Sequence, residues 1–95
     1  MTAPRRLDES EIAAALAALP HWTRRGDHIE RTFRFPDFTR AFGFMSSAAL
    51  VAERLNHHPD WHNVYATVTV RLSTHDAGGL TPLDLSLASA LDALA

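Results

Sequence analysis

The fold of this chain is decided by a stretch just past its middle, Asn56-His57-His58-Pro59-Asp60-Trp61. The residues before it have the periodicity of a helix, and those after it alternate as a strand does. Because proline disfavours helical geometry at the residue before it, we expect the helix to end by about Asn56. The stretch therefore predicts two adjacent imidazoles at the end of a helix, followed at once by a carboxylate and an indole.

The segment before this stretch predicts a long amphipathic helix. Pro36-Asp37 opens it, with Asp37 as the N-cap. Apolar side chains then recur with the 3.6-residue period, and we expect this stripe, with its aromatic side chains, to lie in the core. Its members are Phe38, Ala41, Phe42, Met45, Ala48, Ala49, Ala52 and Leu55. The small alanines would let another element approach closely.

The segment after the stretch predicts strand structure, because apolar and polar residues alternate over residues 62–73. One unbroken strand of about 12 residues would span about 40 Å, at ~3.3 Å for each residue. His75 would then lie far from His58. If these histidines act together, either the strand reverses near Ala66-Thr67, or His75 meets the histidine pair of another copy.

The N-terminal third predicts a short helix and a β-hairpin. We expect residues 1–6 to form a loose tail. Asp8 and Glu11 have the spacing of a capping box, which predicts a helix over residues 9–18 that packs on the core. The turn signal Gly26-Asp27 then predicts a hairpin, with one strand on each side of it.

The C-terminal part predicts a loop over residues 76–80 and a last helix. Thr81 is its expected N-cap, with Pro82 at N1 and Asp84 at N3. A carboxylate at N3 stabilises the positive end of a helix. That is the simplest explanation of Asp84, and a role in binding a ligand would be additional.

Composition indicates one globular domain. The chain has 95 residues, of which 46% are hydrophobic and 21% charged. A net charge of −2 gives no bulk attraction to nucleic acid or an anionic membrane. The absence of cysteine excludes disulfides and thiol nucleophiles, and no apolar run approaches the ~20 residues of a membrane span. We expect a soluble cytoplasmic protein.

Histidines supply the candidate chemistry. Four of the six histidines lie between His57 and His75. Imidazole titrates near neutrality, so it can both give and take a proton. Glu53, which lies on the same helix face as His57, and Asp60 would favour a protonated histidine pair, whereas burial in an apolar pocket would oppose it. The cluster predicts general acid and base catalysis.

Two neighbours of the histidine pair have two explanations each. Trp61 offers a flat surface for stacking an aromatic ligand, or it is a core or interface side chain. Asn56 either hydrogen-bonds a ligand or caps the end of the helix. The residues alone leave both open.

Other chemistries have less support. His58 and His62 have a zinc-like spacing, but Pro59 interrupts the helix between them. No serine lies in a nucleophile elbow, and no glycine-rich loop is present to bind phosphate. We therefore expect no metal site.

Taken together, these motifs resemble the pterin-4a-carbinolamine dehydratases, which in animals are also known as a dimerisation cofactor of a homeodomain transcription factor. The resemblance is strong from about Phe33 to Asp84. The matching residues are Phe33, Phe35, Asp37-Phe38, Ala41-Phe42-Gly43-Phe44-Met45, Ala52-Glu53, the stretch from Asn56 to Trp61, Asn63-Val64-Tyr65, Thr74-His75 and Gly79-Leu80-Thr81 with Asp84.

The resemblance implies an α+β fold over residues 1–95, with an N-terminal helix followed by β-β-α-β-β-α. The four strands would form an antiparallel sheet with the helices packed on one face, which supplies the strand reversal. The implied reaction is dehydration of 4a-hydroxytetrahydropterin to quinonoid dihydropterin. This reaction recycles the cofactor of aromatic amino acid hydroxylases, and the family needs no metal or organic cofactor.

Residue by residue, the resemblance implies that the catalytic histidines are His57, His58 and His75. We expect His57 and His75 to transfer protons and His58 to bind and orient the substrate. The positions expected near or lining the pterin pocket are Glu53, Asn56, Asp60, Trp61, Thr74 and Asp84.

Two other functions are compatible with the same fold. The protein could be a binding module that associates with a regulator or another enzyme. It could also act on another pterin or assist the assembly of an unrelated enzyme. Retention of all three histidines favours the dehydratase. The expected partners are a pterin substrate and further copies of the chain, as a dimer or tetramer, with no nucleic acid or membrane.

Overall fold

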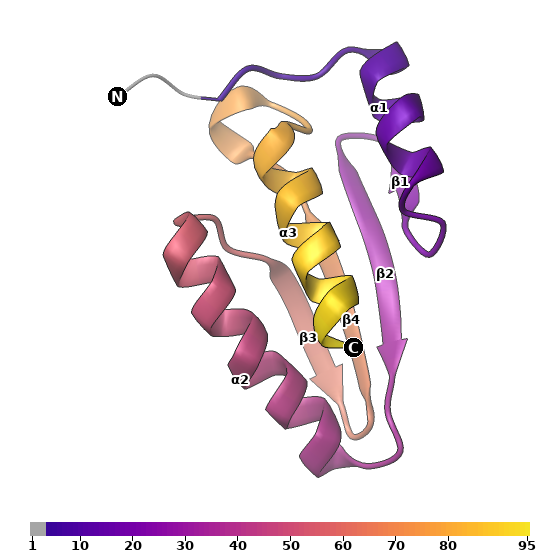
Figure 1. Ribbon diagram of the computed structural model, residues 1–95, viewed down its shortest axis with the longest axis vertical. Coiled ribbons are helices and arrows are strands. Elements are labelled where there is room, and N and C mark those ends of the chain that lie inside the picture. Colours follow the sequence, from indigo (N-terminus) through magenta and orange to yellow (C-terminus); the bar gives the residue numbers. More distant parts are fainter. Residues whose placement is uncertain (1–3) are drawn as a thin grey trace.

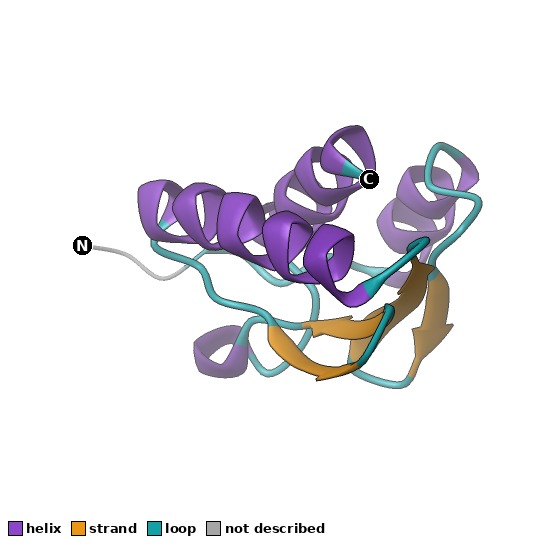
Figure 2. Ribbon diagram, turned by 90° about the horizontal axis from the view of Figure 1, so that it is seen from below, coloured by secondary structure: helices purple, strands orange, loops and turns teal. Residues whose placement is uncertain are grey.

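Helices and strands form two layers in the computed structural model, which describes residues 4–95 (Figure 2). One antiparallel sheet, in the order β1-β2-β4-β3, contains β1 (Thr23–Arg25), β2 (His28–Arg34), β3 (Asp60–Val64) and β4 (Thr67–Leu72). Three helices lie on one face of it, namely α1 (Glu9–Ala17), α2 (Phe38–Leu55) and α3 (Pro82–Leu94) (Figure 1). A short 3₁₀ turn, η1 (His75–Ala77), lies between β4 and α3. The expected α+β order of elements is confirmed.

The hydrophobic core lies between the sheet and the helices. Val68, Val70 and Leu72 of β4 are fully buried, while the residues between them are not, which is the period of a strand with one solvated face. Leu87, Ala88 and Leu91 of α3 pack on the core from the helical layer. Among the helices of residues 4–95, none has the length and apolar character needed to cross a membrane.

The chain reverses direction between β3 and β4 at Tyr65-Ala66. Tyr65 has a positive φ of 51°, and β4 then runs antiparallel beside β3. The reversal expected near Ala66-Thr67 is therefore confirmed. It brings His75 to the same cavity as His58 within one chain, so no second copy is needed for the three histidines to meet.

The turn also changes which side of the sheet Val64 occupies. Because the turn contains two residues, Val64 pairs with Thr67 rather than continuing the inward series that begins at Val68. Val64 is 60% exposed, whereas an unbroken alternation would place it in the core. The alternating apolar side chains of residues 62–73 therefore point into the core only on β4.

The stripe predicted for α2 is wrong at Phe38, Phe42 and Ala49, which are exposed. Phe38 and Phe42 are 51% and 56% exposed, and their ring centroids lie 5.8 Å apart. The face of α2 that is buried contains Ala41, Phe44, Ala48 and Ala52. Apolar residues on α2 are numerous enough to fit two overlapping stripes, so periodicity alone does not choose between them.

Contacts between aromatic side chains determine which face of α2 is buried. Phe44 contacts two phenylalanines of the β2 region, at 4.7 Å from the ring centroid of Phe33 and 5.0 Å from that of Phe35. Such aromatic pairs add to the free energy gained from burial alone. Burying Phe44 turns Phe38 and Phe42 away from the sheet.

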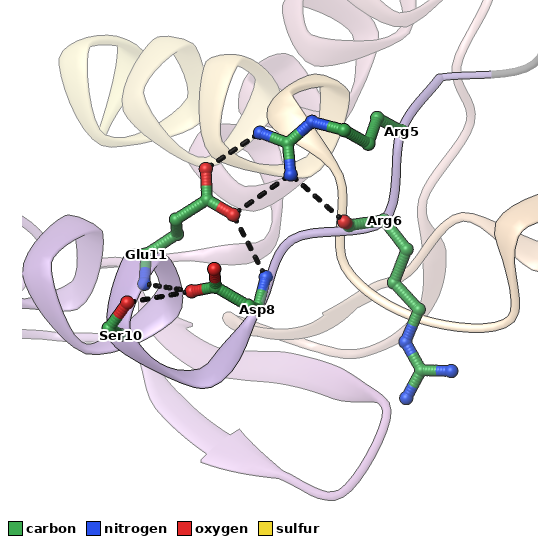
Figure 3. A network of polar contacts seen from close by, with 5 residues as sticks. All are labelled: Arg5, Arg6, Asp8, Ser10 and Glu11. Atoms are coloured by element: carbon green, nitrogen blue, oxygen red, sulfur yellow. Dashed lines mark hydrogen bonds and ion pairs between the residues drawn. The ribbon is translucent and has the colours of Figure 1, made fainter.

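Arg5 and Arg6, within the loose tail expected over residues 1–6, lie exposed in the irregular segment before α1. Arg5 pairs with both oxygens of Glu11, at 2.9 and 2.7 Å (Figure 3). Glu11 also completes the predicted capping box with Asp8. The hydrogen bond from Arg5 lowers the pKa of Glu11 to about 2. Residues 1–3 of the expected tail lie outside the described residues.

Candidate active site

Asn56 ends α2 in the left-handed conformation, with φ 52° and ψ 43°. The N–H of His57 donates to the carbonyl of Ala52 at 3.0 Å, and the N–H of Asn56 donates to that of Glu53 at 3.1 Å. These two bonds form a Schellman motif. Asparagine enters the left-handed region more readily than most residues, so Asn56 has a structural role that fixes where His57 leaves the helix.

His57 is directed at a buried carboxylate. Its Nε2 lies 2.5 Å from Oδ1 of Asp84, in the first turn of α3. His57 is 9% exposed and Asp84 is fully buried. A carboxylate in such a position must be compensated by donors, because an isolated buried charge is very unfavourable.

The second oxygen of Asp84 is also occupied. Oδ2 accepts from the hydroxyl of Thr74 at 2.8 Å and from the backbone N–H of Thr81 at 2.9 Å. The hydroxyls of Thr74 and Thr81 lie 2.7 Å apart. One carboxylate therefore joins the end of α2, the segment after β4 and the start of α3.

Asp84 and Thr74 both make buried hydrogen bonds at the site. Both were expected near or lining the substrate pocket. Asp84 has no exposed surface and both of its oxygens are bonded, so it lies beneath His57, whereas Thr74 lines the cavity. The hydroxyl of Thr74 is likewise engaged by Asp84 and Thr81.

His58 lies on the exposed side of the helix end. Its Nε2 is 2.6 Å from Oε1 of Glu53, and the two side chains are 57% and 76% exposed. Glu53, which was expected on the face of His57 and beside the histidine pair, thus contacts His58 rather than His57. The left-handed residue at position 56 turns His57 inward and leaves His58 above Glu53. An exposed pair of this kind orients a side chain but adds little to stability.

The three histidines border one cavity of about 270 Å³, between the end of α2 and the segment after β4. His75 reaches it from η1. The full lining is Asn56, His57, His58, Ser73, Thr74, His75 and Asp76. Two other cavities, beside α1 and between α2 and the C-terminus, are lined without histidine.

Asp60 and Trp61 are not part of this lining. Trp61 packs against the hydrophobic core from β3, which is the structural explanation of the indole. Asp60 is exposed on β3 opposite Arg71 of β4. Successive residues of a strand point to opposite faces, so the two side chains diverge directly after the histidine pair.

Three residues of the site were not singled out as site residues from the sequence. Ser73 and Asp76 line the cavity, and Thr81 completes the hydrogen bonds around Asp84. Ser73 and Asp76 flank Thr74-His75 directly, so their position in the chain was an available signal. Thr81 was recognised only as a helix cap, because a capping residue carries no sign of what its hydroxyl meets.

Metal ligation finds no support in the geometry. Within residues 4–95, no group of three or more histidine, aspartate or glutamate side chains is placed to hold a metal ion. His62, which has the zinc-like spacing with His58, lies exposed on β3 and outside the lining of the cavity.

Comparison with known proteins gives the family. The family model for pterin 4 alpha carbinolamine dehydratase matches residues 5–94. The chain belongs to this family. A protein of Bradyrhizobium diazoefficiens with the name "Putative pterin-4-alpha-carbinolamine dehydratase" is 55% identical over 92 residues, which cover 95% of this chain and 92% of the relative. A relative of the same name from Solibacter usitatus is 53% identical over 90 residues, 95% of each chain.

Solved structures agree on the fold. The crystal structure of a transcriptional coactivator/pterin dehydratase from Brucella melitensis has a TM-score of 0.93 at 48% identity, covering 96% of this chain and 99% of that chain. A pterin dehydratase-like protein, identified as a RuBisCO assembly factor in the alpha-carboxysome, has a TM-score of 0.64 at 18% identity, covering 77% of this chain and 84% of that chain. At that identity the second likeness shows the fold alone.

Proposed function

We propose that this member of the pterin-4a-carbinolamine dehydratase family dehydrates 4a-hydroxytetrahydropterin to quinonoid dihydropterin by histidine general acid and base catalysis. The observation that carries the proposal is the convergence of His57, His58 and His75 on one cavity. Its volume of about 270 Å³ is just below the usual range for drug-sized ligands, which suits a small bicyclic ring.

The reaction requires two proton transfers and no redox change. A general acid protonates the 4a-hydroxyl, the C4a–O bond breaks, and water leaves with the bonding electrons. A general base removes the proton from N5, and the electrons of the N5–H bond form the C4a=N5 double bond. Imidazole is suited to both steps because its acid and base forms coexist near neutrality.

The geometry supports a division of roles among the histidines. His57 is buried and firmly held, and His75 reaches the same cavity from the other segment, so these two transfer the protons. His58 is exposed and oriented by Glu53, which suits binding and orienting the substrate. Which of His57 and His75 is the acid depends on the stereochemistry at C4a. Asn56 borders the same cavity and contributes its amide to binding.

In metabolism, this reaction returns the oxidised pterin to the cycle that serves aromatic amino acid hydroxylases. The supporting observation is the family membership together with the three histidines in one cavity.

The direct test is an assay of dehydration on synthetic 4a-hydroxytetrahydropterin, followed by stopped-flow absorbance. We expect His57→Ala and His75→Ala each to lower kcat by about 100-fold, a typical contribution of one acid–base group. His62→Ala is the matched control, because it removes an exposed imidazole that does not border the cavity. Unchanged turnover in both His57→Ala and His75→Ala would contradict the proposal.

Self-association is a second part of the proposal. Phe38 and Phe42 form an exposed aromatic pair on α2, and β3 leaves one edge of the sheet unpaired. Exposed aromatic surface and free strand edges both favour contact with another chain. The protein therefore forms a homo-oligomer, a dimer or tetramer, in which these surfaces are covered.

A further inference from the structure

The hydrogen bonds around Asp84 have one consistent set of directions. A carboxylate accepts and cannot donate, so the hydroxyl of Thr74 donates to Oδ2. Having given its proton to Asp84, the Thr74 oxygen accepts from the hydroxyl of Thr81, 2.7 Å away. The Thr81 oxygen in turn accepts the backbone N–H of Leu83 at 3.3 Å. All the protons therefore point from the first turn of α3 toward the carboxylate.

Because the carboxylate of Asp84 only accepts hydrogen bonds, its contact with His57 determines which ring nitrogen carries a proton. Oδ1 of Asp84 lies 2.5 Å from Nε2 and accepts its N–H. Nε2 therefore holds a proton in both charge states of the ring, and Nδ1 is the nitrogen that gains and loses one. Because His57 borders the cavity, Nδ1 is the atom that can exchange a proton with a bound molecule.

We propose that Thr74 and Thr81 are positioning residues that hold His57 in the Nε2–H tautomer by fixing the carboxylate of Asp84. The inference rests on the proposed dehydration for its effect on catalysis. It adds Thr81, a residue with no exposed surface, to the groups on which proton transfer depends. Loss of the Thr74 hydroxyl removes one of the two donors to Oδ2, which frees the carboxylate to rotate and relaxes the orientation of the ring.

Burial strengthens the series of hydrogen bonds that links Thr81, Thr74 and Asp84. Thr74 is 6% exposed, and Thr81 and Asp84 are fully buried, so bulk water does not replace a lost donor. In such surroundings each hydrogen bond is stronger and each unpaired group is more costly than at the surface. Thr32 and Thr69 offer a matched contrast, because their hydroxyls lie 3.3 Å apart on the neighbouring strands β2 and β4 and neither lines the cavity.

The first test is nitrogen-15 NMR of the imidazole rings in the unmodified protein, with His57 assigned by comparison with His57→Gln. We expect the neutral ring of His57 to show a protonated Nε2 and an unprotonated Nδ1. A proton on Nδ1 would overturn the proposal. Because this measurement needs neither a substrate nor a threonine variant, it decides the tautomer even where the protein fails to dehydrate the pterin.

The second test compares Thr74→Val with Thr74→Ser and with the control Thr69→Val. We expect Thr74→Val to give a mixture of His57 tautomers and to lower kcat roughly tenfold, with KM within about twofold. Thr74→Ser restores the hydroxyl and keeps kcat within about twofold of the parent, as Thr69→Val does. Unchanged tautomer and kcat in Thr74→Val, or an equal loss in Thr74→Ser, would refute the positioning role. Circular dichroism of each variant verifies that it is folded.

Discussion

His57 and Asp84 are 27 positions apart in the sequence, yet Nε2 of the imidazole lies 2.5 Å from Oδ1 of the carboxylate. The contact crosses from the end of α2 to the start of α3. Since Oδ2 of the same carboxylate binds Thr74, the residue before His75, this one side chain fixes the relative position of two of the three histidines. The proposed acid and base are thus placed by a residue that has no exposed surface.

Replacing Asp84 by asparagine tests this relationship. The amide replaces one acceptor oxygen by an NH2 group, so a donor now faces either Nε2–H of His57 or the donors of Thr74 and Thr81. We expect kcat for pterin dehydration to fall by about 100-fold, because a misplaced acid–base group loses that much. The free energy of unfolding should fall by about 1–3 kcal/mol, the cost of an unsatisfied buried group. Stopped-flow kinetics measures kcat, and urea unfolding measures the free energy of unfolding.

Asp92→Asn is the matched control for that variant. Asp92 is also on α3 and also accepts hydrogen bonds, from Trp22 at 2.8 Å and Arg31 at 2.5 Å, but it lies outside the cavity. We expect its kcat to stay within about twofold of the parent, since its partners are not part of the site. An equal loss of kcat in both variants would contradict a specific role for Asp84.

The left-handed conformation of Asn56 predicts opposite effects of two small substitutions. Asn56→Ala places an ordinary Cβ residue at φ 52°, and we expect it to lower the free energy of unfolding by about 1 kcal/mol. Asn56→Gly removes that strain and should leave stability near the parent value or above it. Urea unfolding distinguishes them. If alanine proved as stable as glycine here, the backbone argument would fail.

The ion pair between Arg5 and Glu11 predicts that its contribution to the free energy of unfolding decreases at low pH. The Arg5 hydrogen bond lowers the pKa of Glu11 to about 2, from an ordinary 4.5. The unfolded chain therefore takes up a proton at Glu11 before the folded chain does. The contribution of the pair is present above pH ~4.5 and is lost as the pH falls toward 2.

Glu11→Gln provides the measurement. The difference in unfolding free energy between parent and variant should be constant at neutral pH and should shrink between pH ~4.5 and 2. A difference that stays constant down to pH 2 would show that the Arg5 pair does not contribute.

The exposed phenylalanines of α2 predict a change of oligomeric state. We expect Phe42→Ser to shift the protein toward the monomer in light scattering coupled to gel filtration, because it removes apolar area from the proposed interface. Leu50→Ser alters an even more exposed apolar residue of the same helix, 74% exposed, and should leave the mass unchanged. A parent protein that is monomeric at all concentrations would contradict the proposed association.

Much of the fold was predictable from local signals. The capping box at Asp8, the turn at Gly26-Asp27 and the N-cap at Thr81 all describe interactions between residues close in sequence. The reversal at Tyr65-Ala66 was required by distance rather than by a strong turn signal. The buried face of α2 was not predictable, because the choice of Phe44 over Phe42 depends on contacts with Phe33 and Phe35 on another element.

The site was predictable in its residue types but not in its connections. The crowding of His57 and His58 at a helix end identified the region, His75 belonged to the same cluster in the sequence, and the family resemblance implied its catalytic role. Glu53 contacts His58 and Asp84 contacts His57 because Asn56 adopts the left-handed conformation. The sequence alone does not give the backbone angles of Asn56. Of the two explanations left open for Trp61, the structure shows packing on the hydrophobic core from β3, outside the lining of the cavity.

The carboxylate that joins three segments has a consequence for how the site forms. A chain that ended before Thr81 would contain all three histidines but would lack the acceptor that orients His57. The site therefore cannot assemble from the central helix and hairpin alone, and its geometry appears only when the C-terminal helix docks. Opening of the first turn of that helix, as hydrogen exchange would detect it, disconnects the proposed catalytic pair while most of the sheet remains intact.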